Sequence, residues 1–193
     1  HIRMLRDIDA IYPQTKYLTS QLQKKYKFNN VYQLHNFRIN DNNEVPKSEM
    51  KTRYENINLV FMARVHPMKG VDLLFELSER IPKSTNIKVF IDLYGPIYDE
   101  YKDEFEKKLK SNSVIKYRGI LQPDNIQDTL AKYDLMLFPT KYFTEGFPGS
   151  ILDAYMAGIP VIATKWKYAD EFIADHVSGV ISPFDDDDAF IEN

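Results

Sequence analysis

Between residues 57 and 181, short apolar runs alternate with segments of helical periodicity, and this alternation restricts the chain to few folds. The runs at 59–63 (Leu-Val-Phe-Met-Ala) and 135–138 (Leu-Met-Leu-Phe) contain no polar residue. Strands that are apolar on both faces are typical of a parallel sheet covered by helices on both sides. The pattern therefore predicts an α/β domain built on a doubly wound parallel sheet.

The expected strands are the apolar runs near residues 57–64, 87–93, 114–118, 134–138, 160–163 and 179–181. The expected helices have apolar residues at helical spacing, near residues 69–80, 99–109, 125–132, 150–156 and 168–174. Residues 1–30 are expected to be mainly helical, because Leu18, Leu22 and Tyr26 fall on one helical face. The polar segment at 40–47 interrupts the pattern and predicts a linker.

Composition and charge exclude several classes of protein. The formal net charge of −3 and the isoelectric point near 5.8 argue against a nucleic-acid-binding protein. The chain has no cysteine, which excludes disulfides and cysteine-ligated metal centres. No apolar run is long enough to span a bilayer, and the first residues lack the apolar core of a signal peptide. We expect a cytoplasmic protein, attached at most to the inner face of the membrane.

The loops that follow the strands are the places to look for chemistry, because an open parallel sheet binds ligands beyond the carboxyl ends of its strands. Arg64 would lie at the end of the first strand and Lys69 at the start of the next helix. Two cations beside a helix N-terminus suit a diphosphate. An exposed loop with two solvated bases fits the spacing equally well. Gly95, after the second strand, would let a ligand approach the backbone or would form a plain turn.

The segment from 138 to 163 carries the most information. A strand ends at residue 138, a loop carries Glu145, and a helix begins near Ser150. The amides of Gly149, Ser150 and Ile151 would point at an anion. Glu145 and Asp153 would flank this anion, and two flanking carboxylates suit a ligand that has sugar hydroxyls on both sides of a phosphate. Asp153 also fits another interpretation, since Ser150-x-x-Asp153 has the pattern of a capping box.

Taken together and in order, these segments resemble the donor domain of retaining GT-B glycosyltransferases (glycosyltransferase family 4-like, group 1). The family's Arg-x4-Lys-Gly matches residues 64–70, and its Glu-x7-Glu matches residues 145–153 with Asp as the second acid. Ala-Gly-Ile-Pro-Val-Ile-Ala at 157–163 also matches. The resemblance covers most of residues 31–184 and implies a Rossmann-like sheet that is one half of a GT-B fold.

The resemblance also implies roles for individual residues. Arg64 and Lys69 would neutralise the diphosphate of the sugar donor, Glu145 would bind hydroxyls of the transferred sugar, and Asp153 would hold the ribose diol. The backbone that cradles phosphate and sugar would come from Gly146, Phe147, Gly149, Ser150, Ile151 and Leu152. The remaining donor-binding positions would be Gly70, Gly95, Gly119, Ile120 and Leu121, the last three lining the base pocket. Neither a metal nor a cofactor is implied.

The function implied by the resemblance is transfer of a sugar from a nucleotide diphosphate sugar to a glycan or lipid-linked acceptor, with retention, in bacterial polysaccharide biosynthesis. Residues 1–40 would end an acceptor-binding N-terminal domain that this chain lacks, residues 41–56 would be the linker, and residues 57–193 (or 31–193) the nucleotide-sugar-binding domain. This half alone would be inactive, and the full-length protein would associate peripherally with the membrane.

Three alternatives remain open at this point: a GT-B-like sugar-nucleotide epimerase, a nucleotide-sugar-binding module without transfer activity, and a Rossmann-like scaffold with no ligand. The run of four Asp at 185–188 formally contains the Asp-x-Asp of metal-dependent enzymes, but an acidic helix N-terminus explains it better. His35 and His66 are expected to be loop or edge residues without a catalytic role.

Overall fold

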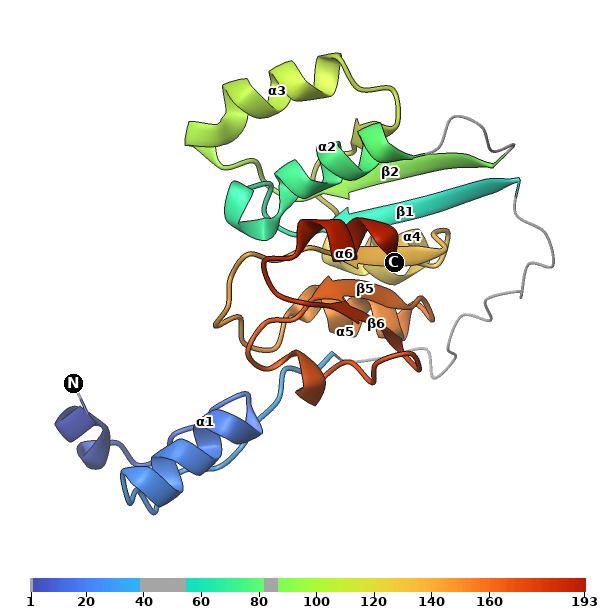
Figure 1. Ribbon diagram of the computed structural model, residues 1–193. Coiled ribbons are helices and arrows are strands. Elements are labelled where there is room, and N and C mark those ends of the chain that lie inside the picture. The colour runs from blue at the N-terminus through green and yellow to red at the C-terminus, as the bar shows by residue number, and fades with distance from the viewer. Residues whose placement is uncertain (1, 39–54, 82–86) are drawn as a thin grey trace.

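A computed structural model describes residues 2–38, 55–81 and 87–193 of the chain. The expected linker at 41–56 therefore lies almost entirely outside the described residues. Within the described part, the chain forms a sheet domain and an N-terminal segment that extends away from it (Figure 1). No helix in these three ranges is long and apolar enough to cross a membrane.

The core of the fold is a six-stranded parallel sheet with the order β3-β2-β1-β4-β5-β6 (Figure 1). Its strands are β1 (Asn56–Met62), β2 (Lys88–Tyr94), β3 (Ile115–Tyr117), β4 (Leu135–Phe138), β5 (Val161–Thr164) and β6 (Gly179–Ser182). All five neighbouring pairs run parallel. The expected Rossmann-like, doubly wound α/β fold is confirmed, and each strand lies within two residues of its expected bounds.

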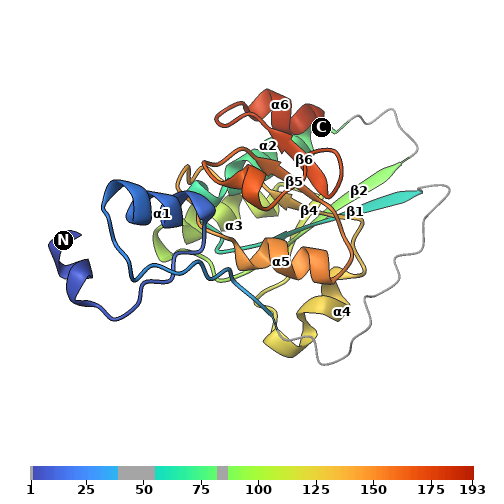
Figure 2. The same cartoon turned by 90° about the horizontal axis from the view of Figure 1, so that it is seen from below.

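Helices cover both faces of the sheet. They are α2 (Val71–Arg80), α3 (Lys102–Lys110), α4 (Ile126–Leu130), α5 (Gly149–Met156) and α6 (Asp187–Glu192). Short 3-10 turns precede three of them, at Pro67–Lys69, Asp99–Tyr101 and Pro123–Asn125. Figure 2 shows α2 and α6 on one side of the sheet and α4 and α5 on the other.

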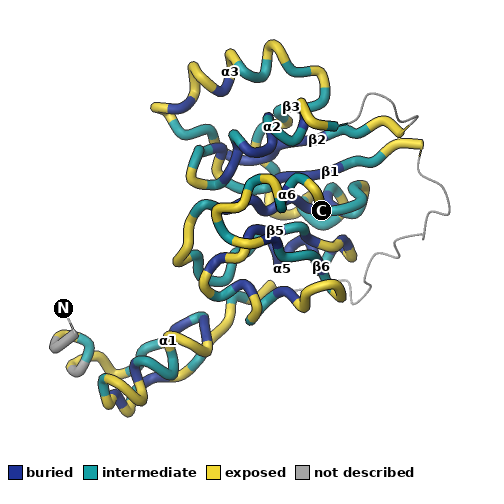
Figure 3. The backbone as a smooth tube through the Cα atoms, in the orientation of Figure 1, coloured by how far each residue is buried: buried dark blue, intermediate teal, exposed yellow. Residues whose placement is uncertain are grey.

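The alternation of side chains along β1 divides the core into two layers. Leu59 and Phe61 pack with α2, α3 and α6, whereas Val60 packs with α4 and α5. Each of these three side chains is at most 8% exposed. Figure 3 shows the buried residues concentrated along the strands and on the inward faces of the helices. Burial on both faces explains why the strands read as continuous apolar runs.

The helix expected at 168–174 is wrong: the segment forms only a 3-10 turn at Ala169–Glu171. The amide of Ala174 donates to Ser178 Oγ (3.1 Å), which takes the place of a further helical bond. The side-chain hydroxyl thereby competes with the backbone acceptor that a longer helix would need. The apolar spacing remains, because Ala169 and Ile173 are both buried against the sheet.

The N-terminal segment is less helical than expected. It consists of a 3-10 helix (Ile2–Asp7), α1 (Lys16–Ser20) and a π-helical turn (Gln21–Lys25). Between the first two the chain is not helical, and Ile11 forms a parallel bridge with Val31. Pro13 lies in this stretch and has no amide hydrogen to donate to a helix.

The acidic run at 185–188 forms a helix N-terminus, as expected. Asp186 is the N-cap of α6, and its carboxylate accepts a hydrogen bond from the amide of Ala189 (3.0 Å). Asp187 pairs with Lys141 (2.6 Å) and Asp188 pairs with Arg80. Among the described residues, no group of three or more His, Asp or Glu is arranged to hold a metal ion.

Candidate functional site

The candidate site lies where the order of the strands reverses, between β1 and β4. The loops after these two strands leave the same edge of the sheet and touch each other. The amide of Lys141 donates to the carbonyl of Met68 (3.0 Å). Gly70 has a φ of +77°, and a Cβ at this residue would lie 1.8 Å from the carbonyl oxygen of Pro139. The reversal point of an open parallel sheet is where such folds bind ligands.

The two loops border an open cavity of about 330 Å³ lined by Arg64, His66, Lys69 and Tyr142. Lys69 Nζ forms an ion pair with Glu145 Oε2, and the two side chains are only 23% and 19% exposed. Lys69 Nζ also lies 5.3 Å from the centre of the Tyr142 ring. The structure thus brings together the three residues expected to be catalytic: Arg64 and Lys69 line one cavity, and Glu145 is bound to Lys69.

The two cations in the cavity differ in their pairing. Glu145 neutralises Lys69, and Thr140 Oγ1 lies 3.4 Å from the same carboxylate oxygen as a hydrogen-bond donor. Arg64, in contrast, forms no ion pair with any residue in the part of the chain that the structure describes. Its guanidinium therefore brings an uncompensated positive charge to the cavity, as binding of an anionic ligand requires.

His66 is a loop residue, as expected, but it also lines the cavity, which the sequence analysis missed. It caps the 3-10 turn at Pro67–Lys69, and its Nδ1 accepts a hydrogen bond from the amide of Met68 (2.9 Å). Its ring packs on Tyr98, with centroids 4.4 Å apart. The sequence signal for this role is the position of His66 between Arg64 and Lys69 in one short loop.

Asp153 is not part of a capping box, so that interpretation is wrong. Helix α5 begins at Gly149 with Pro148 as N-cap, and no side chain caps it. Asp153 is 4% exposed, and its two carboxylate oxygens accept from Arg38 Nε (2.7 Å) and Nη2 (3.1 Å). This hydrogen bonding raises the pKa of the Arg38 guanidinium above its ordinary value. Arg38 was not expected at the site, and no local pattern points to it.

The loop before α5 is held by the N-terminal segment as well. Phe147 donates its amide hydrogen to Gln14 Oε1 (3.2 Å), and its carbonyl accepts from Asn36 Nδ2 (2.6 Å). The Phe147 ring stacks on Phe172 at 4.1 Å with an interplanar angle of 7°. Part of the backbone expected to cradle phosphate and sugar, from Gly146 to Leu152, is therefore in contact with the first 38 residues.

The loops after β2 and β3 meet beside this site. The amide of Gly95 donates to the carbonyl of Gly119 (2.8 Å), and Tyr117 Oη donates to the carbonyl of Gly95 (2.9 Å). A Cβ on Gly95 would lie 1.9 Å from the Ala63 carbonyl oxygen, so the space beside this glycine is filled by protein backbone. Ile120 is 60% exposed, while Leu121 is partly buried against the α4 and α5 layer.

Comparison with known proteins shows which family and fold this chain is similar to. A family model described as "Glycosyl transferases group 1" matches residues 44–193. An uncharacterised 41.2 kDa protein in the cps region of Klebsiella pneumoniae is 28% identical over 145 residues, which is 75% of this chain and 38% of that protein. The gpi3 subunit of phosphatidylinositol N-acetylglucosaminyltransferase from Schizosaccharomyces pombe is 26% identical over 132 residues, 68% of this chain and 28% of its own length. The chain thus spans less than two fifths of either relative.

Solved structures with the same fold include GT-B glycosyltransferases. A TarM variant of S. aureus in complex with fondaparinux, alpha-GlcNAc-glycerol and UDP superposes with a TM-score of 0.77 at 20% identity, over 99% of this chain and 37% of TarM. HepE of Anabaena in complex with UDP and glucose gives 0.75 at 15% identity, over 99% of this chain and 55% of HepE. At these identities the similarity is evidence of fold alone.

Proposed function

The chain belongs to the group 1 family of glycosyl transferases, and from this premise we propose that it binds the nucleotide diphosphate sugar for transfer of the sugar to a glycan or lipid-linked acceptor, with retention. The observation that carries the proposal is the meeting of Arg64, Lys69 and Glu145 at the carboxyl ends of β1 and β4. A scaffold domain without a ligand would not need these charged side chains to lie together.

The two cations have a clear chemical task in such a reaction. As the bond between the sugar and the diphosphate breaks, negative charge grows on the departing phosphate oxygens. Arg64 can bind two of these oxygens through its planar guanidinium, and Lys69 can approach as a point charge. Fixed positive charge at this position lowers the barrier, because it is oriented before the reaction begins. This arrangement supplies the charge that a divalent metal would otherwise bring, so we propose that transfer needs no metal.

Glu145 and Asp153 would bind the hydroxyls of the sugar donor. The Lys69 ammonium holds the Glu145 carboxylate at the cavity, where it can accept hydrogen bonds from the transferred sugar. Asp153 would accept from the ribose while still paired with Arg38, since each carboxylate oxygen has more than one lone pair. The backbone at 146–152 and the loops at Gly95 and 119–121 would enclose the rest of the nucleotide.

The acceptor would bind to a separate domain, and the setting we propose is bacterial polysaccharide synthesis in the cytoplasm, at the inner face of the membrane. The K. pneumoniae relative, described as lying in a cps region, motivates this setting. Retention is tested by NMR, from the anomeric configuration of a product formed by a protein that pairs this chain with an acceptor domain.

The first test is a calorimetric titration of the chain with UDP, GDP and ADP, and then with their sugars, with and without a chelator. UDP comes first because the complexes of TarM and HepE contain it. We expect one nucleotide to bind regardless of the chelator, and Arg64→Ala and Lys69→Ala to weaken binding at least tenfold. Absence of binding to every nucleotide would contradict the proposal.

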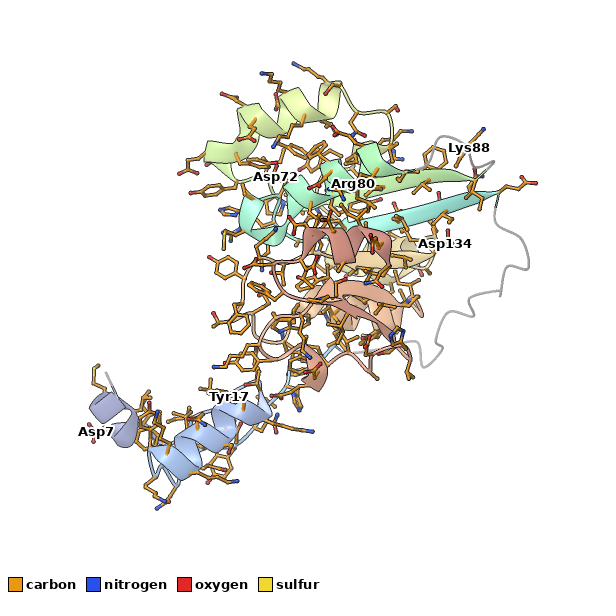
Figure 4. The ribbon with its side chains drawn as sticks, in the orientation of Figure 1. Asp7, Tyr17, Asp72, Arg80, Lys88 and Asp134 are labelled. Carbon is orange, nitrogen blue, oxygen red and sulfur yellow. The ribbon has the colours of Figure 1, made fainter. Side chains whose placement is uncertain are left out.

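Arg80→Ala is the matched control for these titrations. Arg80 is also a partly exposed arginine, but it pairs with Glu76 and Asp188 at the end of α2 that is remote from the cavity (Figure 4). Asp72 marks the opposite end of the same helix, next to the loop that carries Lys69. The control should bind nucleotide as the unsubstituted chain does, which would assign the losses to the cavity.

A further inference from the structure

We propose that His66 is a further ligand of the diphosphate, to which its neutral imidazole donates a hydrogen bond through Nε2. The inference rests on the proposed function and assigns a new residue to the same cavity. It starts from the position of His66, which lines the cavity together with Arg64, Lys69 and Tyr142.

The backbone fixes which nitrogen of His66 carries the hydrogen. The residue is extended (φ −151°, ψ 140°) and caps the turn at Pro67–Lys69. Its Nδ1 accepts the hydrogen bond from the amide of Met68 at 2.9 Å, so this nitrogen must be unprotonated. In a neutral imidazole the hydrogen is then on Nε2. The cap therefore produces one tautomer with a donor at Nε2.

That donor is available to a ligand. Nε2 forms no hydrogen bond with any other residue in the described part of the chain. It is also not buried, so a ligand can reach it. The ring is held in place from two sides, by the Met68 amide and by the Tyr98 ring 4.4 Å away. A donor held in this way loses little freedom when a ligand binds.

The neighbours of His66 indicate a phosphate as its partner. His66 caps the turn that ends at Lys69, and both side chains line the same cavity. Arg64 supplies an uncompensated positive charge to the same cavity. Phosphate oxygens accept hydrogen bonds and carry no hydrogen to donate at neutral pH, so a neutral donor beside two cations complements them without adding charge.

Two substitutions separate the capping role of His66 from its binding role. In His66→Asn the side-chain oxygen still accepts from the Met68 amide, because Asn is a favourable N-cap, but the Nε2 donor is lost. In His66→Gln the amide nitrogen can reach the position of Nε2, but the cap is impaired. We expect His66→Asn to keep the thermal stability of the unsubstituted chain and to weaken nucleotide binding about tenfold. We expect His66→Gln to be less stable and to bind within about threefold of the unsubstituted chain.

A purely structural role predicts the reverse order, with Asn binding normally and Gln binding weakly, and that result would overturn the inference. The measurements are calorimetric titrations with UDP, GDP and ADP and thermal unfolding of the same samples. Lys69→Ala belongs to the same series. If Lys69→Ala loses binding and His66→Asn does not, only the inference about His66 fails. If the unsubstituted chain binds none of these nucleotides, the proposed function fails and the inference fails with it.

Discussion

The contact between Gly70 and Pro139 can be tested by comparing two alanine substitutions that differ in only one respect. Gly70 and Gly119 both adopt left-handed backbone conformations, with φ of +77° and +83°. This conformation costs a residue with a Cβ about 1–2 kcal/mol. A Cβ at Gly119 meets no atom within 4 Å, whereas a Cβ at Gly70 would lie 1.8 Å from the Pro139 carbonyl oxygen. Gly119→Ala therefore measures the backbone strain alone.

The expected difference follows from the overlap at Gly70. Contacts of a real Cβ below 3.0 Å are essentially never observed, and the obstructing atom belongs to the backbone. The loops after β1 and β4 must therefore separate by more than an ångström. Overpacking of this kind costs about 1–3 kcal/mol in addition to the strain. We expect Gly119→Ala to lower the free energy of unfolding by about 1 kcal/mol and Gly70→Ala by about 3 kcal/mol.

The assay is urea denaturation followed by the fluorescence of Trp166, the single tryptophan of the chain. Its side chain is 1% exposed and packs edge-on against Phe138 at the end of β4. For a chain of this size, a difference of about 2 kcal/mol corresponds to roughly 4–8 °C in Tm. Equal losses in the two variants would refute the reasoning, because the two loops would then not be in the close contact described.

Three further substitutions have definite expected outcomes. Arg38→Ala leaves the buried Asp153 carboxylate unpaired and should lower the free energy of unfolding by about 2 kcal/mol, a value between those of exposed and buried ion pairs. Adding Asp153→Asn should recover part of this loss, and urea titrations measure both. Burial and the hydrogen bonds to Tyr94 and Asp92 raise the pKa of Tyr133, so this phenol favours the folded state below pH 10 and loses that effect as the pH rises further. Tyr133→Phe should therefore flatten the alkaline decline of stability, and an unchanged slope would contradict this. Asp186→Ala should lower the free energy of unfolding by about 1 kcal/mol, and Asp186→Asn by only a few tenths of a kcal/mol, because Asn still caps α6. Thermal unfolding measures both.

The sheet could be predicted from sequence because its signal is local. Val60 and Met136 are fully buried, and burial on both faces leaves a continuous apolar run that can be read directly. The meeting of Lys69 with Glu145 could also be inferred, although 76 residues separate them. Both follow strands of one parallel sheet, and parallel topology gathers the loops at one edge.

Other features depended on contacts that leave no local pattern. The pairing of Arg38 with Asp153 joins residues 115 positions apart, and it requires the N-terminal segment to return to α5. Ser150-x-x-Asp153 matches the capping-box pattern, but the Asp153 carboxylate binds the Arg38 guanidinium 2.7 Å away instead of a helix amide. At Ala174, helical spacing was likewise overridden by a serine hydroxyl four residues further on.

The attachment of the N-terminal segment has a mechanical consequence. Among the described residues, its hydrogen bonds to the domain fall on three places. Gln14 and Asn36 bind both backbone groups of Phe147, and Arg38 binds the Asp153 carboxylate. Glu171 accepts from the amides of Lys16 and Tyr17 at the start of α1 (Figure 4). A rotation of this segment against the sheet must either break these bonds or displace the loop that carries Glu145. The attachment therefore couples the orientation of the segment to the position of this loop, and with it to the Glu145 carboxylate that binds Lys69.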